Sequence, residues 1–224
     1  MKHILFLTLA LCLGSGTAFA VTIDFTDPIF NPGGASSITQ TVGGITVTVE
    51  AILPAGATLF WSGVGAPSGF GLDGFGVNSS SYEDDEVEGP DRLKVSFGTS
   101  VILSGIGITD LFYEGSSRYR EEGFYSLNGG ADVSFLADTS QLPSPASNGL
   151  LSLTGFAATP VSYIIFSAPG IRNGENHEFS VASLEASPVG VPEPGTLLLL
   201  GAGLLILGLY AGSKTYVKKF AVVD

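Results

Sequence analysis

The stretch from Thr196 to Ser213 constrains this chain more than any other part of its sequence, because it contains no charged residue. An α-helix rises about 1.5 Å per residue, so this stretch would form a rod of roughly 27 Å. That length is close to the ~30 Å hydrocarbon core of a bilayer. We therefore predict a single transmembrane helix over residues 196–213. The lysines of residues 214–224 would then form a basic tail on the cytoplasmic side.

The N-terminal residues 1–20 are typical of a secretory signal peptide. Lys2 precedes an apolar run from Ile4 to Leu13, and the small residues Ala18 and Ala20 mark a cleavage site after Ala20. We expect the Sec translocon to insert this segment and signal peptidase to remove it. Cys12, the one cysteine of the sequence, leaves with it. The mature protein is then expected to have no disulfide, no thiolate metal site and no cysteine nucleophile.

Pro192, Glu193 and Pro194 stand directly before the apolar stretch, and a basic end follows it. In this order the three features resemble the PEP-CTERM sorting signal of bacterial exported proteins. The resemblance implies that the tripeptide is recognised by an exosortase, a membrane transpeptidase-like protease. That protease would remove the helix and pass the protein to the cell surface or the extracellular matrix. The tail differs from the Arg-rich family tail, since its basic residues are lysines and Phe220 to Asp224 follow. A plain C-terminal membrane anchor is the alternative.

The two ends predict one topology for the chain. Lys2 and the C-terminal lysines stay in the cytoplasm by the positive-inside rule, so the chain between them is exported. We expect an exported domain over residues 21–186. Residues 187–195 would be a linker that carries the sorting motif.

Residues 21–186 are rich in Gly, Ser, Thr, Val and Phe and lack a long helical periodicity. Short alternating runs, punctuated by Gly, Pro and Asn, predict an all-β fold, a jelly-roll-like β-sandwich. Hairpin turns are expected at Gly43-Gly44 and Asn128-Gly129-Gly130. Gly56 to Gly76 is expected to be a long loop or irregular strands. The expected strands are residues 21–25, 36–50 with its break at the glycine pair, 93–97, 101–108, 123–127, 131–137, 150–153, 161–167 and 178–185.

Residues 74–137 also resemble, more loosely, an exported domain that recurs beside PEP-CTERM tails. An acidic segment is followed by a strand from Leu93 to Phe97, an apolar strand and an Asn-Gly-Gly hairpin. This resemblance implies a jelly-roll β-sandwich and no particular activity.

The exported part of the chain is acidic. The chain has 21 Asp and Glu against nine Lys and Arg, and the basic residues between 21 and 190 are Arg92, Lys94, Arg118, Arg120 and Arg172. Such a surface repels nucleic acid and anionic polymers. It suits neutral partners, basic partners or Ca²⁺, and nucleic acid is excluded as a partner.

An acidic run is the strongest local anomaly of the exported domain. Its carboxylates are Glu83, Asp84, Asp85, Glu86 and Glu88, and Asp91 follows. Ca²⁺ takes six to eight oxygen ligands, so a loop with these residues is a hypothetical Ca²⁺ site. The spacing does not match an EF-hand loop, however. A solvated edge strand, on which charge discourages aggregation, is the alternative interpretation.

Exposed aromatic side chains could supply a platform for sugar stacking. Trp61 and Tyr82 are the candidates for this role, accompanied by Phe60, Tyr113, Tyr119 and Tyr125. Aromatic side chains also fill the cores of β-sandwiches, and that is the competing interpretation.

Signals of catalysis are poor in this sequence. His177 is the one histidine that remains after signal cleavage, and no Gly-x-Ser-x-Gly elbow supports a serine nucleophile. Its neighbours Asn173 to Asn176 predict a solvated turn. No pair of acidic residues is singled out for glycoside cleavage. We therefore predict a protein that is not an enzyme.

The leading hypothesis is a non-catalytic exported protein, sorted by exosortase and associated with exopolysaccharide in a biofilm matrix. A Ca²⁺-dependent, lectin-like carbohydrate-binding module is the first alternative. A hydrolase of matrix polysaccharide is the second, and it requires two carboxyl groups about 5–9 Å apart in a cleft.

Overall fold

The computed structural model describes residues 19–64, 73–79, 86–114, 119–141, 148–169, 177–189, 200–208 and 210. Two compact units are distinguished, and Phe19–Val189 forms the larger one, called the β unit below. Its strands are β1 (Val21–Asp24), β2 (Ser37–Val42), β3 (Ile45–Leu53), β4 (Thr58–Ser62), β5 (Gly74–Asn78), β6 (Arg92–Thr109), β7 (Tyr113–Glu114), β8 (Tyr119–Arg120), β9 (Glu122–Leu127), β10 (Val133–Leu136), β11 (Leu151–Thr154), β12 (Pro160–Ser167) and β13 (Ser180–Pro188). A short 3-10 helix, η2, covers Pro28–Phe30.

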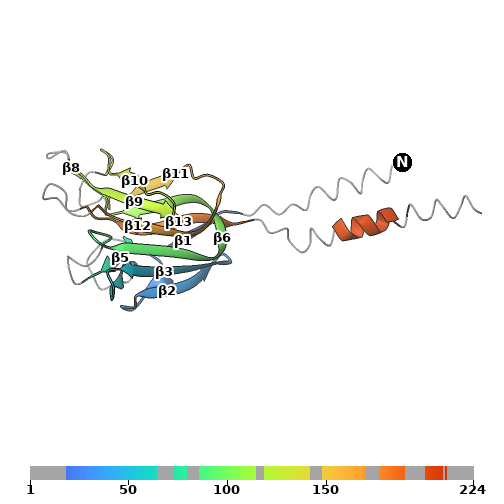
Figure 1. Cartoon of the computed structure of the whole chain (residues 1–224), viewed down its shortest axis with the longest axis horizontal. Helices are drawn as coiled ribbons and strands as arrows, with labels where there is room; N and C mark the ends of the chain where they lie inside the picture. The colour runs from blue at the N-terminus through green and yellow to red at the C-terminus, as the bar shows by residue number, and fades with distance from the viewer. Residues whose placement is uncertain are drawn as a thin grey trace, which may run out of the picture. The chain divides into compact units, whose positions relative to one another are not determined.

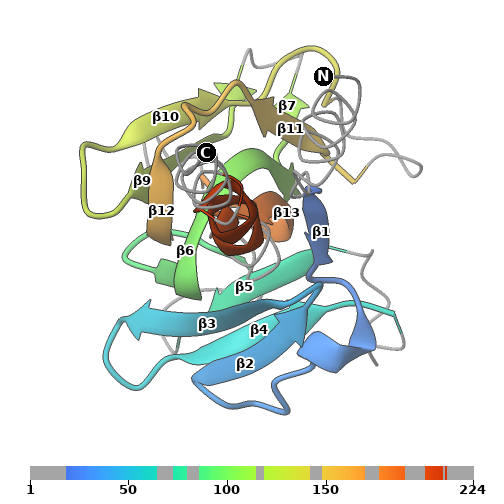
Figure 2. The same ribbon diagram turned by 90° about the vertical axis from the view of Figure 1, so that its right-hand side faces the viewer.

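The β unit is built on an antiparallel sheet of eleven strands, which confirms the predicted mostly-β class (Figure 1). Its main path runs β10-β9-β12-β6-β13-β5-β4, with β1 beside β13, β11 and β3 beside β6, and β2 beside β3. Strands β7 and β8 form a separate two-stranded sheet. Figure 2 shows β9, β10 and β12 in one half of the unit and β2, β3, β4 and β5 in the other.

The two halves share the long strand β6. Its first part, residues 92–97, pairs with β3 on one side and β12 on the other. Its second part, residues 101–109, pairs with β13, and β11 pairs with residues 105–108. The prediction of two separate strands, 93–97 and 101–108, was therefore wrong: the chain continues through Gly98, Thr99 and Ser100 as strand. A register shift in β12 between Val161 and Tyr163 accommodates the additional β6 residues.

Both predicted hairpins are confirmed. Gly43 and Gly44 have φ angles of 55° and 82°, and Val42 pairs with Ile45 across this two-residue turn. Glycine adopts a positive φ without steric cost. Two successive residues with positive φ give the turn a backbone twist that matches the twist of the two flanking strands. The second hairpin joins β9 to β10, with φ of 53° at Asn128 and 72° at Gly129.

Strand β4 lies inside the interval from Gly56 to Gly76, which was expected to be a long loop or irregular strands, and β5 begins inside it and ends at Asn78. They pair from Thr58 with Asn78 to Ser62 with Gly74. The apolar side chains Leu59, Trp61 and Val77 are buried. The frequent glycines of this interval interrupt the alternation of apolar and polar residues, so the sequence pattern did not predict regular strands. Whether a strand is buried also depends on its neighbours in the sheet.

Apolar side chains from both halves form one continuous core. Phe25, Phe30 and Phe75 pack edge to face, with ring centroids 5.1, 5.5 and 6.2 Å apart. Phe135 and Phe179 form a further edge-to-face pair at 5.0 Å. Offset and edge-to-face contacts of this kind are the favoured geometries for buried aromatic rings.

The second unit comprises Met1–Ala18 and Gly190–Asp224, of which the structure describes a helix over residues 200–208 and residue 210. Leucines exposed by 53 to 66% occur along this helix, at positions 200, 204, 205 and 207. Among the residues that the structure describes, no helix has both the length and the apolar character needed to span a membrane. The predicted signal peptide through residue 18 and the flanks of the predicted span lie outside the described residues.

Candidate functional site

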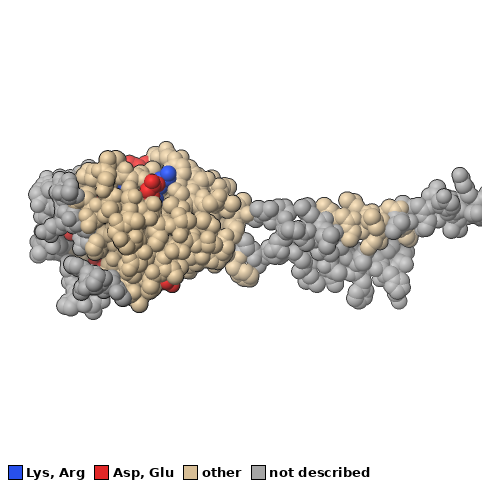
Figure 3. Space-filling model, turned by 90° about the horizontal axis from the view of Figure 1, so that it is seen from below, with Lys and Arg blue, Asp and Glu red and all other residues tan. Residues whose placement is uncertain are grey.

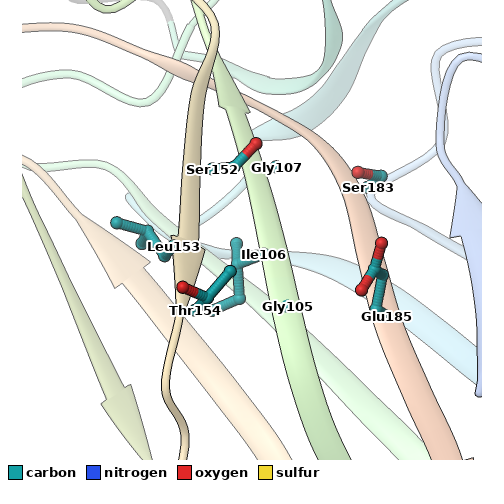
Figure 4. Close-up of a pocket in the computed structure, with 8 residues that line it drawn as sticks. All are labelled: Gly105, Ile106, Gly107, Ser152, Leu153, Thr154, Ser183 and Glu185. Atoms are coloured by element: carbon teal, nitrogen blue, oxygen red, sulfur yellow. The ribbon is translucent and has the colours of Figure 1, made fainter.

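A hollow of about 70 Å³ lies beside β6, between β11 and β13 (Figure 4). We call it the glycine groove. Its lining residues are Gly105, Ile106, Gly107, Ser152, Leu153, Thr154, Ser183 and Glu185.

The strand register arranges the polar groups of the groove in two rows. Ser152 pairs with Gly107, which pairs with Ser183 on the opposite side. Thr154 pairs with Gly105, which pairs with Glu185. Side chains alternate between the two faces of a sheet, so these positions share the outer face. The residues between them, Ile106 on β6 and Leu184 on β13, are buried in the core.

The glycines of β6 allow the side chains of β13 to lean over the strand. A Cβ at position 107 would lie 2.4 Å from Ser183 Oγ, and a Cβ at position 105 would lie 3.1 Å from Glu185 Oε2. A glycine inside a strand often marks close approach by another group. Here that group is the hydroxyl of Ser183 in one row and the carboxylate of Glu185 in the other.

The groove offers hydrogen bonds of both kinds. The hydroxyls of Ser152, Thr154 and Ser183 can donate and accept, whereas the carboxylate of Glu185 accepts when it is ionised. Glu185 and Thr154 are exposed, so both can reach a ligand from solvent. The eight lining residues include no histidine, cysteine or lysine. The arrangement can bind a polar ligand, but it lacks a nucleophile paired with a base.

Strand β1 extends the polar surface beyond β13. Asp24 pairs with Ser183, and Thr22 pairs with Glu185. The carboxylate of Asp24 accepts hydrogen bonds from the backbone N–H of Thr26 at 2.9 Å and from its hydroxyl at 2.7 Å. This local turn fixes the orientation of the Asp24 side chain beside the groove.

The predicted acidic site is described only in part. Glu83, Asp84 and Asp85 lie outside the described residues. Glu86 is half-buried, and Glu88 is only 2% exposed. Between them, Val87 donates its backbone N–H to Phe179 O at 2.8 Å.

The end of the acidic run is therefore packed into the β unit. Glu88 and Asp91 are both buried, which corrects the interpretation of this part as a solvated edge. The hydrogen bond from the Val87 backbone N–H to Phe179 O, next to β13, explains the burial, because it holds the segment against the core. No group of three or more His, Cys, Asp or Glu among the described residues is placed to hold a metal ion.

The aromatic candidate Trp61 belongs to the core. Its side chain is 8% exposed, and its Nε1–H donates to Phe25 O at 2.7 Å. Gly63 packs so closely that a Cβ there would lie 2.1 Å from the indole Cζ2. Trp61 therefore lacks the open ring face that sugar stacking requires, and the stacking role is corrected to a packing role. Tyr82 lies outside the described residues.

His177 was expected in a solvated turn, and that expectation was wrong. Its side chain is 6% exposed, and Nδ1 accepts a hydrogen bond from the Glu122 backbone N–H at 3.0 Å. The contact with the first residue of β9 buries the imidazole. Its near neighbours in sequence, residues 171–176, lie outside the described part.

The predicted processing sites lie mostly beyond the described residues. Pro192, Glu193, Pro194 and Ala18 are in this group. Ala20 is described and exposed, directly before the first residue of β1.

Sequence reasoning did not find the glycine groove. The available signal was the pair Gly105 and Gly107, which occupies alternate positions in an apolar strand. That spacing places both glycines on one face. The partners of that face, from β11 and β13, come from distant parts of the sequence and could not be assigned to it without the fold.

No protein-family model matches the sequence, and no curated protein matches it. Among solved structures, the chain is similar to the crystal structure of an exo-beta-1,3-galactanase from Phanerochaete chrysosporium with galactose. The sequence identity is 12% and the TM-score is 0.34. The match covers 76% of this chain and 30% of that chain, so this chain spans less than a third of the galactanase. A likeness at this level assigns no function.

Proposed function

We propose that this chain is a non-catalytic exported protein of the cell surface or extracellular matrix, sorted through its C-terminal segment. The β unit, with a jelly-roll-like β-sandwich fold, is the cargo. The signal peptide directs export through the Sec translocon, and the C-terminal helix holds the protein in the inner membrane. An exosortase then acts near Glu193 and releases the protein into exopolysaccharide.

The apolar surface of the C-terminal helix is the observation that carries this proposal. Leu200, Leu204, Leu205 and Leu207 are each more than half exposed, and Ile206 is 47% exposed. A helix that is apolar on all sides belongs in a protein core or in lipid. Together with the uncharged sequence from Thr196 to Ser213, this surface favours insertion into a membrane.

The β unit supports the role of cargo because it contains its own core. The described core residues run from Ile23 to Ala186. Strand β13 ends at Pro188, just before the segment that would be removed. Removal of residues after 190 therefore takes away none of these core side chains.

Mass spectrometry of the protein in its native host, or in a host that encodes an exosortase, tests the proposal. We expect peptides of residues 21–190 in the matrix fraction and no peptide containing Leu200 there. Pro194→Ala should retain the full chain in the membrane fraction. Pro188→Ala is the matched control, because this exposed proline lies outside the motif, and it should be processed normally.

Released protein that still contains Leu200 would overturn processing by exosortase. Wild-type protein retained in the membrane with Leu200 would instead support the plain anchor. Loss of membrane association in a Leu205→Arg variant is expected in either case, because a charge at the centre of a span costs about 2.5–3.5 kcal/mol or more.

A further inference from the structure

We propose that one end of the β unit, called the neutral end below, lies against the phospholipid headgroups of the membrane while the protein is anchored. This inference rests on the proposed function, because it requires the C-terminal membrane anchor. It goes further by assigning to the β unit a contact surface and a partner of defined chemistry.

The neutral end is the end at which β13 leaves the β unit. Pro188 of β13 and Val161 of β12 both pair with Val101, and Figure 2 shows β6 curving here from one half of the unit to the other. The hairpin at Gly43 packs on Val21, because a Cβ at position 43 would lie 2.6 Å from Val21 Cγ1. The described segments of this end are residues 20–21, 42–45, 98–101, 128–132, 155–160 and 188–189.

Both ends of β6 lie at the opposite end of the unit. Arg92 pairs with Ser167, which pairs with Phe124. Thr109 pairs with Ser180, and the neighbouring Phe179 packs on Gly123, where a Cβ would lie 2.7 Å from its ring. The chain segments before and after β6 therefore gather at this opposite end, which we call the acidic end.

Charged residues are distributed unequally between the two ends. Among the described residues of the neutral end, Asp132 is the one that carries a charge. The face of the β unit seen in Figure 3 shows no Lys, Arg, Asp or Glu around this end. The described charged residues of the acidic end are Glu86, Glu88, Asp91, Asp110, Glu114, Arg120, Glu121, Glu122, Asp138 and Glu178.

The chain between β13 and the predicted membrane span is short. Only residues 189–195 separate Pro188 from Thr196. A fully extended chain covers at most about 3.3–3.6 Å per residue, so these residues reach no further than about 25 Å. The neutral end therefore stays within that distance of the membrane throughout the anchored stage.

Electrostatics favour contact through the neutral end. Anionic headgroups repel the carboxylates of the acidic end, and salt limits this repulsion to a range of about 8 Å. The neutral end approaches the headgroups without that penalty, and the exposed hydroxyls of Thr99 and Thr159 can donate to phosphate oxygens. The anchored β unit then directs its acidic end away from the bilayer.

Fluorescence quenching in reconstituted vesicles tests the inference. The protein is purified from the membranes of an exporting host without an exosortase. The vesicles contain phosphatidylcholine, phosphatidylglycerol and a lipid with a nitroxide headgroup. The expected mature chain has no cysteine, so Thr159→Cys at the neutral end and Thr139→Cys at the acidic end each provide one site for a fluorophore, and both threonines are exposed. We expect quenching to be at least about threefold stronger at position 159.

A pair of matched variants tests the role of charge in this contact. Thr99→Asp combined with Ala158→Asp adds two carboxylates at exposed positions of the neutral end. This variant should lose about half or more of the quenching at position 159 and regain it in 1 M salt, where the screening length is about 3 Å. Thr99→Asn combined with Ala158→Asn adds no charge and should be quenched like the wild type. Thermal unfolding verifies that each variant is folded.

Two results overturn the inference and leave the anchor in place. One is protein that floats with the vesicles but is quenched equally at positions 159 and 139, or more strongly at 139. The other is an aspartate variant that is quenched like the asparagine variant. Protein that does not float with the vesicles at all overturns the anchor itself, and this inference with it.

Discussion

At the scale of single residues, Asn128 shows how one side chain can fix a turn against a neighbouring strand. Its Oδ1 accepts hydrogen bonds from the backbone N–H groups of Ser162 at 2.7 Å and Tyr163 at 3.3 Å. Its Nδ2 donates to Pro160 O at 3.0 Å. The backbone has φ of 53°, which Asn tolerates better than most residues. The β9–β10 turn is therefore held to the start of β12.

We predict that Asn128→Ala lowers the free energy of unfolding by about 1–3 kcal/mol, because it loses these bonds and strains the backbone. Asn128→Gly relieves the strain but still lacks the bonds, so it should be intermediate. Urea unfolding of the wild type and both variants measures the two contributions. A glycine variant as stable as the wild type would show that the side-chain bonds contribute nothing.

Asp138 gives the β unit a local dependence on pH. The Ser140 hydroxyl, and then the Ser140 backbone N–H at 2.7 Å, lower the pKa of this carboxyl below its ordinary value of 3.8. Because the folded pKa is the lower one, the stabilisation is fully present above the ordinary value. It is lost as the pH falls through the folded pKa.

We predict that Ser140→Ala destabilises the β unit at neutral pH and that the difference from the wild type shrinks in acid. Urea unfolding between pH 7 and pH 2 measures this difference. Ser100→Ala is the control, because Ser100 hydrogen-bonds the hydroxyl of Ser162 rather than a carboxylate. Its effect should stay constant over the same range, and a constant effect for Ser140→Ala would contradict the assignment.

At the scale of elements, the sequence was informative where the structure is decided locally. Glycine pairs and Asn-Gly require positive φ, so the turns at Gly43-Gly44 and Asn128-Gly129 could be predicted from residue type alone. The continuity of β6 through Gly98 could not be predicted from residue type. Residues 98–100 lack the alternation of apolar and polar side chains that predicts a strand. The missing side chain of Gly98 avoids a close contact with β3, since a Cβ there would lie 3.1 Å from Thr46 Cβ.

In the candidate site, too, some features can be predicted from the sequence and others depend on strand pairing. The alternate placement of Gly105 and Gly107 is visible in the sequence, whereas the approach of Ser183 and Glu185 depends on pairing with β13. The burial of Trp61 could not be predicted, because residue type does not distinguish a buried indole from an exposed one. In the fold, the indole is buried and its Nε1–H donates to Phe25 O.

The close contact between β6 and β13 predicts a steric effect with a specific remedy. Gly107→Ala would place a Cβ 2.4 Å from Ser183 Oγ, so we expect a loss of about 1–3 kcal/mol in unfolding free energy. In a Ser183→Ala background the next atom is Ser183 Cβ at 3.6 Å, an ordinary contact. The same glycine substitution should then cost much less. A double-mutant cycle by urea unfolding measures the coupling, and additive effects would contradict the proposed contact.

At the scale of the whole molecule, the chain forms two compact units. The β unit, Phe19–Val189, contains the described core and the glycine groove. The described part of the other unit presents an apolar helix, and the face of this helix seen in Figure 3 shows no Lys, Arg, Asp or Glu. Folding information and the proposed sorting information therefore occupy separate parts of the sequence, and each can be changed without altering the residues of the other.

We predict that a chain ending at Gly190 unfolds within about 2 °C of the full-length protein but loses membrane association and processing. The described core residues all precede the cut, so the cut removes no apolar contact among them.

A chain ending at Phe179 is the control. It lacks β13, which pairs with β1, β5 and β6, and it should not fold. Circular dichroism on heating measures stability, and fractionation measures location. A large loss of stability on ending the chain at Gly190 would show that the β unit depends on the C-terminal segment, whereas unchanged location would remove the sorting role of that segment.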